Sequence, residues 1–121
     1  MVKCLIADDS KIIRMLFAKI MGNLGFEILE AEDGEEVVEL CQQHEPELIM
    51  MDYRLPALDG IDAMYKIRNS RLVNQPKIMF CSSLTDLDVI QEAMNGGADD
   101  YVMKPFDEEI IISKLAIMGM I

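Results

Sequence analysis

The chain has 121 residues, of which 51% are hydrophobic and 27% are charged, and its formal net charge is −11. This length suits one domain, so we expect a single domain over residues 1–121. An acidic surface repels nucleic-acid phosphates and anionic lipids, and no apolar run approaches the length of a membrane span. Neither nucleic acid nor a membrane is therefore expected as a direct partner.

The three cysteines, Cys4, Cys41 and Cys81, do not follow a paired spacing. Their odd number argues against a disulfide framework or a zinc site. The acidic residues begin at Asp8, which leaves no room for a signal peptide. These features together predict a protein of the reducing cytoplasm.

Extended and helical patterns alternate along the chain. Apolar or alternating runs predict strands at residues 2–7, 26–30, 48–51, 77–81 and 101–103. Apolar residues at helical spacing predict five helices: over 11–24, between Asp33-Gly34 and Glu45-Pro46, from Ile61 to near Asn69, from a cap at Thr85 or Asp86 to Gly96-Gly97, and after Asp107. Asp9 or Ser10 can cap the first helix. The order predicts an α/β fold, with a doubly wound five-stranded parallel sheet flanked by five helices.

Polar groups follow four of these strands at the point where each strand ends. They are Asp8-Asp9, Asp52, Ser82-Ser83 and Lys104-Pro105. Each motif alone is common as a turn or a helix cap. Because parallel strands present their carboxyl ends at one edge of the sheet, all four should converge there.

The converging groups suit phosphoryl chemistry beside a divalent cation. Mg²⁺ prefers hard oxygen ligands, and Asp8, Asp9 and Asp52 supply carboxylates. An aspartate carboxylate can attack an activated phosphoryl group, and the Lys104 ammonium can stabilise the transferred charge. Either Ser82 or Ser83 can donate a hydroxyl to a phosphate oxygen.

These residues resemble the receiver domain of bacterial two-component response regulators, most closely in length the stand-alone CheY-like receivers. The resemblance covers the whole chain and implies a flavodoxin-like fold. It is carried by Asp8-Asp9, Asp52 with Pro56 and Gly60, Ser82, Gly97-Ala98-Asp99 before Tyr101, and Lys104-Pro105-Phe106.

The resemblance also implies a role for each site residue. Asp52 would be the phosphoacceptor, and Mg²⁺ would be held by Asp8, Asp9, Asp52 and the backbone carbonyl of Arg54. The other implied roles are phosphoryl binding by Lys104 with Ser82 or Ser83, a conformational switch at Ser82 and Tyr101, a cis peptide bond before Pro105, and structural positions at Pro56 and Gly60.

The partners implied are a sensor histidine kinase or a histidine phosphotransfer protein as donor, and an unidentified output protein. Output would pass through the face formed by the fourth helix, fifth strand and fifth helix. The last helix carries surplus apolar residues, Ile110, Ile112 and Ile117, beside the expected core positions Ile111, Leu115 and Met118. The surplus indicates either a wide core stripe or a surface for a partner or a second copy.

Other functions stay open at this level. The chain could be a phosphate sink for a shared kinase instead of a switch with its own output. A Mg²⁺-dependent aspartyl phosphatase is disfavoured, because haloacid-dehalogenase-like enzymes have a second aspartate two residues after the nucleophile, where this chain has Arg54. We therefore expect a switch that is not a multiple-turnover enzyme. A receiver that never takes phosphate is disfavoured because the acceptor, the acidic pair and the lysine are all present.

Overall fold

The computed structural model describes residues 2–83 and 87–121, and strand and helix alternate five times along it. In chain order the elements are β1 (Lys3–Ala7), α1 (Lys11–Asn23), β2 (Glu27–Ala31), α2 (Gly34–His44), β3 (Leu48–Asp52), α3 (Gly60–Arg68), β4 (Lys77–Ser83), α4 (Leu87–Gly96), β5 (Asp100–Lys104) and α5 (Glu108–Ile117). The strands form one sheet in the order β2-β1-β3-β4-β5, and every neighbouring pair is parallel. The predicted fold class is confirmed.

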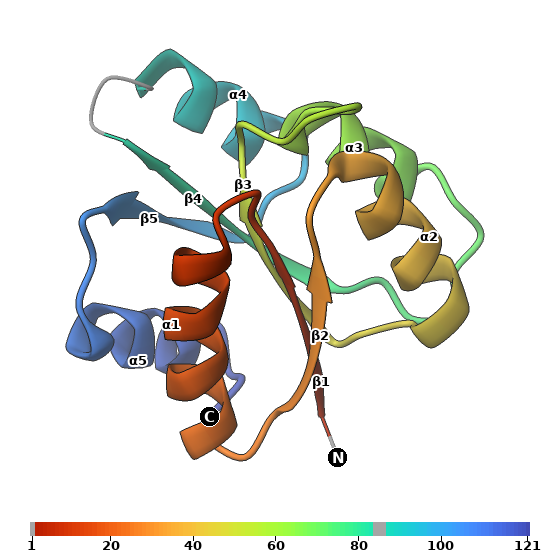
Figure 1. Cartoon of the computed structure of the whole chain (residues 1–121). Coiled ribbons are helices and arrows are strands. Elements are labelled where there is room, and N and C mark those ends of the chain that lie inside the picture. Colours follow the sequence, from red (N-terminus) through yellow and green to blue (C-terminus); the bar gives the residue numbers. More distant parts are fainter. Residues whose placement is uncertain (1, 84–86) are drawn as a thin grey trace.

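Each face of the sheet has its own hydrophobic core. Helices α1 and α5 cover one face, and α2, α3 and α4 cover the other (Figure 1). Strand residues alternate between the two cores, so Ile6 and Met50 pack under α1 and α5 while Leu5 and Ile49 pack under the other helices. Burial of both faces holds the strand ends rigidly, and the polar groups that follow them are positioned by this packing. Within residues 2–83 and 87–121, no helix is long and apolar enough to cross a bilayer.

The element boundaries differ from the predicted ones by one or two residues. Strand β2 starts and ends one residue later than predicted, and β4 continues through both serines to Ser83. Ser10, and not Asp9, caps α1, because its hydroxyl accepts a hydrogen bond from the Ile13 amide at 3.3 Å. The predicted cap at Thr85 or Asp86 lies outside the described residues.

Helix α1 carries apolar residues on two sides. Ile12 and Leu16 are 71% and 48% exposed, whereas Arg14, Phe17 and Met21 are buried. The spacing of three and then four residues from Arg14 to Met21 follows one helix face, and this face meets the sheet. The apolar residues of α1 therefore form two stripes, one in the core and one on the surface.

The last helix also has apolar residues on two sides. Ile111 and Leu115 are fully buried and Met118 packs half-buried against the same core, as expected. Ile110 and Ile117 are 42% and 79% exposed, so they are not part of a wide core stripe.

The loop between β3 and α3 is fixed by close backbone contacts. The Pro56 carbonyl accepts hydrogen bonds from the amides of Gly34 and Leu58, and the Gly60 amide donates to the Tyr53 carbonyl at 2.8 Å. A Cβ atom on Gly60 would lie 2.5 Å from the Asp52 carbonyl oxygen and 2.9 Å from the Phe80 ring. Glycine is therefore required where α3 begins, directly behind the end of β3.

We expect Gly60→Ala to lower the free energy of unfolding by about 1–3 kcal/mol, the usual range for overpacking against rigid atoms. Gly22→Ala is the matched control, because a Cβ there meets nothing within 4 Å and alanine favours the helix by about 0.5–1 kcal/mol. Urea denaturation of both variants measures the difference. A Gly60→Ala protein as stable as the wild type would mean that this close approach is not a constraint.

Candidate functional site

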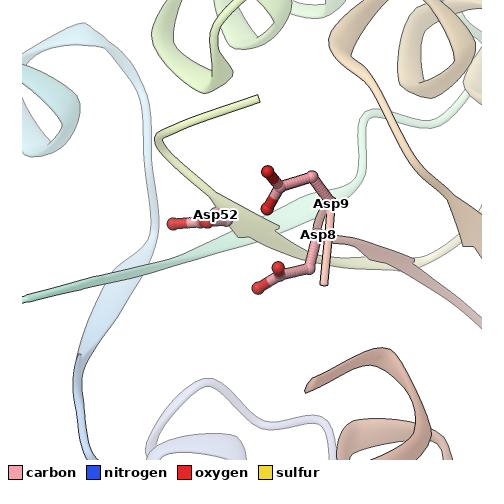
Figure 2. A group of neighbouring side chains, drawn as sticks. All are labelled: Asp8, Asp9 and Asp52. Atoms are coloured by element: carbon pink, nitrogen blue, oxygen red, sulfur yellow. The ribbon is translucent and has the colours of Figure 1, made fainter. Parts of the chain in front are cut away.

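Three carboxylates meet at the carboxyl edge of the sheet. Asp8 and Asp9 directly follow β1, and Asp52 is the last residue of β3, the neighbouring strand. Each of the three carboxylates has one oxygen atom that lies within 4.8 Å of an oxygen atom of each of the other two. Figure 2 shows the three side chains extending toward the same side from these two strand ends.

The donor set fits a small divalent cation. Asp8 is 2% exposed and Asp52 is 9% exposed, whereas Asp9 is exposed to solvent. Such a site offers carboxylate oxygens on one side and room for water ligands on the other, which is the environment that Mg²⁺ prefers. The cluster could therefore hold a metal ion.

Lys104 supplies the positive charge at this cluster. Its ammonium nitrogen lies 3.0 Å from Asp8 Oδ2 and 3.4 Å from Asp52 Oδ2. Lys104 ends β5, so its side chain reaches across the end of β4 to contact both carboxylates. The peptide bond from Lys104 to Pro105 is cis.

Asp8 is held at both its side chain and its backbone. Its Oδ1 accepts a hydrogen bond from the Ser10 amide at 2.9 Å, and its own amide donates to the Ala31 carbonyl at 3.2 Å. Its carbonyl accepts from Arg14 Nη1 at 2.7 Å. The buried arginine had not been identified from the sequence, although the spacing of Arg14, Phe17 and Met21 on one helix face was a usable signal.

Burial and neighbouring charge set the ionisation of the cluster. Burial raises the pKa of Asp52 above its ordinary value, the Lys104 charge lowers it, and the nearby Asp8 carboxylate raises it again. Burial alone would lower the pKa of Lys104, but its hydrogen bond to Asp8 and the charges of Asp52 and Asp8 raise it overall. Lys104 is therefore a cation at neutral pH, and the negative charge of Asp52 is costly in the folded state.

The two serines at the end of β4 occupy different positions. Ser82 is 3% exposed, and its hydroxyl makes no hydrogen bond within the described part of the chain. Cys81 pairs in register with Asp52, so alternation places the Ser82 side chain on the other sheet face, with Phe80. Ser83 pairs in register with Lys104.

Tyr101 lies on that same face of the sheet. It pairs in register with Phe80, is half-buried, and packs against the core under α2, α3 and α4. The Lys114 ammonium lies 4.4 Å from the centre of the ring and 3.0 Å from the carboxylate of Asp100. The ring is therefore placed between the core and a cation on α5.

The structure does not bring every predicted residue into the cluster. Arg54 is exposed two residues after Asp52, and its backbone hydrogen-bonds the Asp52 carboxylate. The role of its carbonyl as a metal ligand stays a prediction. Pro56 lies in the loop between β3 and α3, Gly60 is the first residue of α3, and both support the end of β3 from behind.

The chain belongs to the response regulator receiver domain family, whose profile matches residues 4–116. It is similar to the chemotaxis protein CheY of Bacillus subtilis, with 33% identity over 93% of each chain. It is also 36% identical over 95% of its length to the transcriptional regulatory protein PdtaR of Mycobacterium tuberculosis, of which it spans 55%. The resemblance inferred from the motifs is confirmed.

Solved structures agree with this assignment. The chemotaxis response regulator CheY4 of Vibrio cholerae matches with a TM-score of 0.88 and 26% identity over 97% of this chain and 98% of that chain. The Francisella response regulator 1452 receiver domain matches with a TM-score of 0.85 and 29% identity over 98% and 96%. The chain is a CheY-like receiver domain of two-component signalling.

We expect Asp52→Asn to raise the free energy of unfolding at pH 7 without Mg²⁺, within the range of about 0.5–2 kcal/mol that single stabilising substitutions commonly give. Because the Asp52 pKa is raised in the folded state, ionisation of this carboxyl destabilises the fold relative to the unfolded chain. The wild type should regain this stability as the pH falls from 7 toward 4 and Asp52 takes up a proton. The difference in the free energy of unfolding between Asp52→Asn and the wild type should then disappear. Added Mg²⁺ should also narrow it by binding the folded wild type.

Urea denaturation across this pH range measures the gap. Asp59→Asn is the matched control, since Asp59 only caps α3 and asparagine caps equally well. A gap that stays constant from pH 7 to pH 4 would contradict the expected origin.

Proposed function

We propose that this receiver domain is a phosphorylation-dependent switch that accepts a phosphoryl group on Asp52 with the help of Mg²⁺. The observation that carries the proposal is the convergence of three carboxylates with the Lys104 ammonium, which contacts both Asp8 and Asp52. Asp8, Asp9, Asp52 and the Arg54 carbonyl would hold the ion. The domain would span residues 1–121.

The transfer itself is a displacement at phosphorus. A carboxylate oxygen of Asp52 attacks the phosphorus of a phosphohistidine, an O–P bond forms, and the N–P bond breaks. The electron pair of the broken bond stays on the departing imidazole nitrogen. Mg²⁺, when bound, supplies positive charge to the phosphoryl oxygens. Lys104 then exchanges its contact with Asp52 for a phosphoryl oxygen, so its charge follows the negative charge that arrives.

Ser82 supports the switch because its hydroxyl is buried and has no hydrogen-bond partner among residues 2–83 and 87–121. An unpaired buried hydroxyl costs about 1–3 kcal/mol, and a phosphoryl oxygen on Asp52 offers the missing acceptor. Ser82 would turn toward Asp52, and the Tyr101 ring would move into the space that it leaves. This changes the surface of α4, β5 and α5, where Lys114 contacts Tyr101.

The surroundings of the site favour a protein donor, a sensor histidine kinase or a histidine phosphotransfer protein. A groove of about 390 Å³ beside the site is lined by Ile13, Leu16, Lys104, Pro105 and Phe106. The exposed side chains of Ile12, Met15 and Leu16 extend this apolar surface along α1. A donor helix that packs there would place its phosphohistidine next to Lys104.

Several finer points belong to the same proposal. The exposed Ile110 and Ile117 of α5 offer a surface for an output protein or for a second copy of the chain. A phosphate sink would use the same acceptor chemistry with no output partner. The three cysteines are free thiols, which suits a reducing cytoplasm.

Receiver domains are signalling switches and not classical enzymes. For this chain we propose a single phosphoryl transfer per cycle and no turnover of small phosphate esters. Arg54 supports this, because haloacid-dehalogenase-like phosphatases have an acid/base aspartate at that position.

We expect wild-type protein incubated with Mg²⁺ and acetyl phosphate to gain one phosphoryl adduct, seen by intact-mass spectrometry. Asp52→Asn removes the nucleophile and should gain none, whereas the control Asp59→Asn should gain one as the wild type does. EDTA should suppress the adduct in every sample. An adduct that persists in Asp52→Asn would contradict the assignment of the acceptor.

The two serines can be separated by their effect on the phosphorylated state. Acetyl phosphate with Mg²⁺ should raise the urea midpoint of the wild type and of Ser83→Ala. In Ser82→Ala this rise should be smaller, because the hydroxyl that binds the phosphoryl group is missing. The unphosphorylated Ser82→Ala protein should be at least as stable as the wild type, since no hydrogen bond is lost. The reverse pattern would assign the phosphoryl contact to Ser83.

A further inference from the structure

Arg14 is a buried cation directly beneath the acidic cluster. Its side chain is 8% exposed, whereas the other cations of α1, Lys11 and Lys19, are on the surface. A buried guanidinium is costly unless its donors are satisfied, and here they contact three oxygen atoms. These contacts hold the Arg14 side chain in one defined position.

The three contacts of Arg14 join the turn after β1 to the end of β2. Its Nη1 donates to the Asp8 carbonyl at 2.7 Å, its Nε to Glu30 Oε1 at 3.2 Å, and its Nη2 to Glu32 Oε1 at 3.4 Å. The two glutamates orient the planar guanidinium, and the remaining nitrogen then points at the carbonyl.

The Asp8 carbonyl belongs to the peptide unit that precedes Asp9. A hydrogen bond to this oxygen fixes the plane of that unit, and the plane determines where the Asp9 side chain leaves the backbone. Within the described part of the chain, the Asp9 carboxylate has no hydrogen-bond donor of its own, and it is exposed. Its place beside Asp8 and Asp52 therefore depends on the backbone that carries it.

We infer that Arg14 is a positioning residue for the divalent cation site: it holds the Asp8–Asp9 peptide in the orientation that directs the Asp9 carboxylate into the cluster. This inference rests on the proposed function, because it concerns the ion that the cluster would hold. Arg14 touches neither the ion nor the phosphoryl group. It acts through geometry, and its removal weakens cation binding.

The electrostatic effect of Arg14 has the opposite sign. A positive charge beside a cation site repels the cation, so loss of that charge alone would strengthen Mg²⁺ binding. Loss of the positioning contact would weaken it. The direction of the change in Mg²⁺ affinity therefore separates the two roles.

The test is calorimetric titration of metal-free protein with MgCl₂. Arg14→Met keeps much of the side-chain length and removes the donors, and we expect its Mg²⁺ Kd to rise about tenfold, as for other residues that orient metal ligands. Lys19→Met is the matched control, since it removes one positive charge from the exposed side of the same helix. Its Kd should be unchanged or slightly lower.

The choice of titration temperature separates an effect on cation binding from a loss of folded protein. Each variant is titrated where circular dichroism shows it to be fully folded. If Arg14→Met does not fold, Arg14→Lys replaces it: one ammonium cannot match all three contacts, so its Kd should rise about threefold or more. A Kd equal to or below the wild-type value in the folded variant overturns the inference about Arg14 and leaves the proposed function intact. Absence of Mg²⁺ binding by the wild type overturns the proposed function and the inference with it.

Discussion

The repulsion among three carboxylates that the fold holds within 4.8 Å is the constraint on which the rest of the site depends. Two of them are largely removed from water, and one ammonium, that of Lys104, contacts both of these. Such an arrangement is unfavourable for the folded state without a further cation. In the proposed function, the same repulsion would favour binding of a divalent cation and, with it, of a phosphoryl group. Stability and function therefore oppose each other at Asp52.

The parallel sheet is what makes this crowding possible. Asp8 and Asp52 follow neighbouring strands, and Lys104 reaches them from the edge strand, so groups almost a hundred residues apart meet without any loop insertion. The loop behind them has little freedom, because Gly34 and Gly60 both approach backbone atoms too closely for a side chain. A rigid support of this kind holds the mutually repelling carboxylates close together, since no neighbouring element can relax away from them.

Strand ends were predictable from the sequence because apolar runs and the polar groups that close them are local features. Asp8, Asp9, Asp52 and Lys104 were therefore identified and placed together before the structure was known. Arg14 was not, because its burial depends on Glu30 and Glu32, which lie 16 and 18 residues away and belong to another strand end. The exposure of Ile12 and Leu16 could not be predicted for a related reason: helical spacing identifies apolar stripes but does not say which stripe meets the sheet.

The two cations at the site differ in how freely they can move. Arg14 is nearly fully buried and its contacts are distributed over three oxygens. It would therefore gain little by moving toward a new negative charge. Lys104 is 26% exposed on its side chain and divides one ammonium between two carboxylates, so it can turn to a phosphoryl oxygen at small cost. In the proposed switch Ser82 would gain a partner by the same event, and Tyr101 lies on the same side of the sheet. The half of the site near β1 and α1 is thus fixed while the half near β4 and β5 can rearrange. In the proposed function, a signal that begins at Asp52 would for this reason spread toward α4 and α5, and α1 would be available to bind the donor in both states.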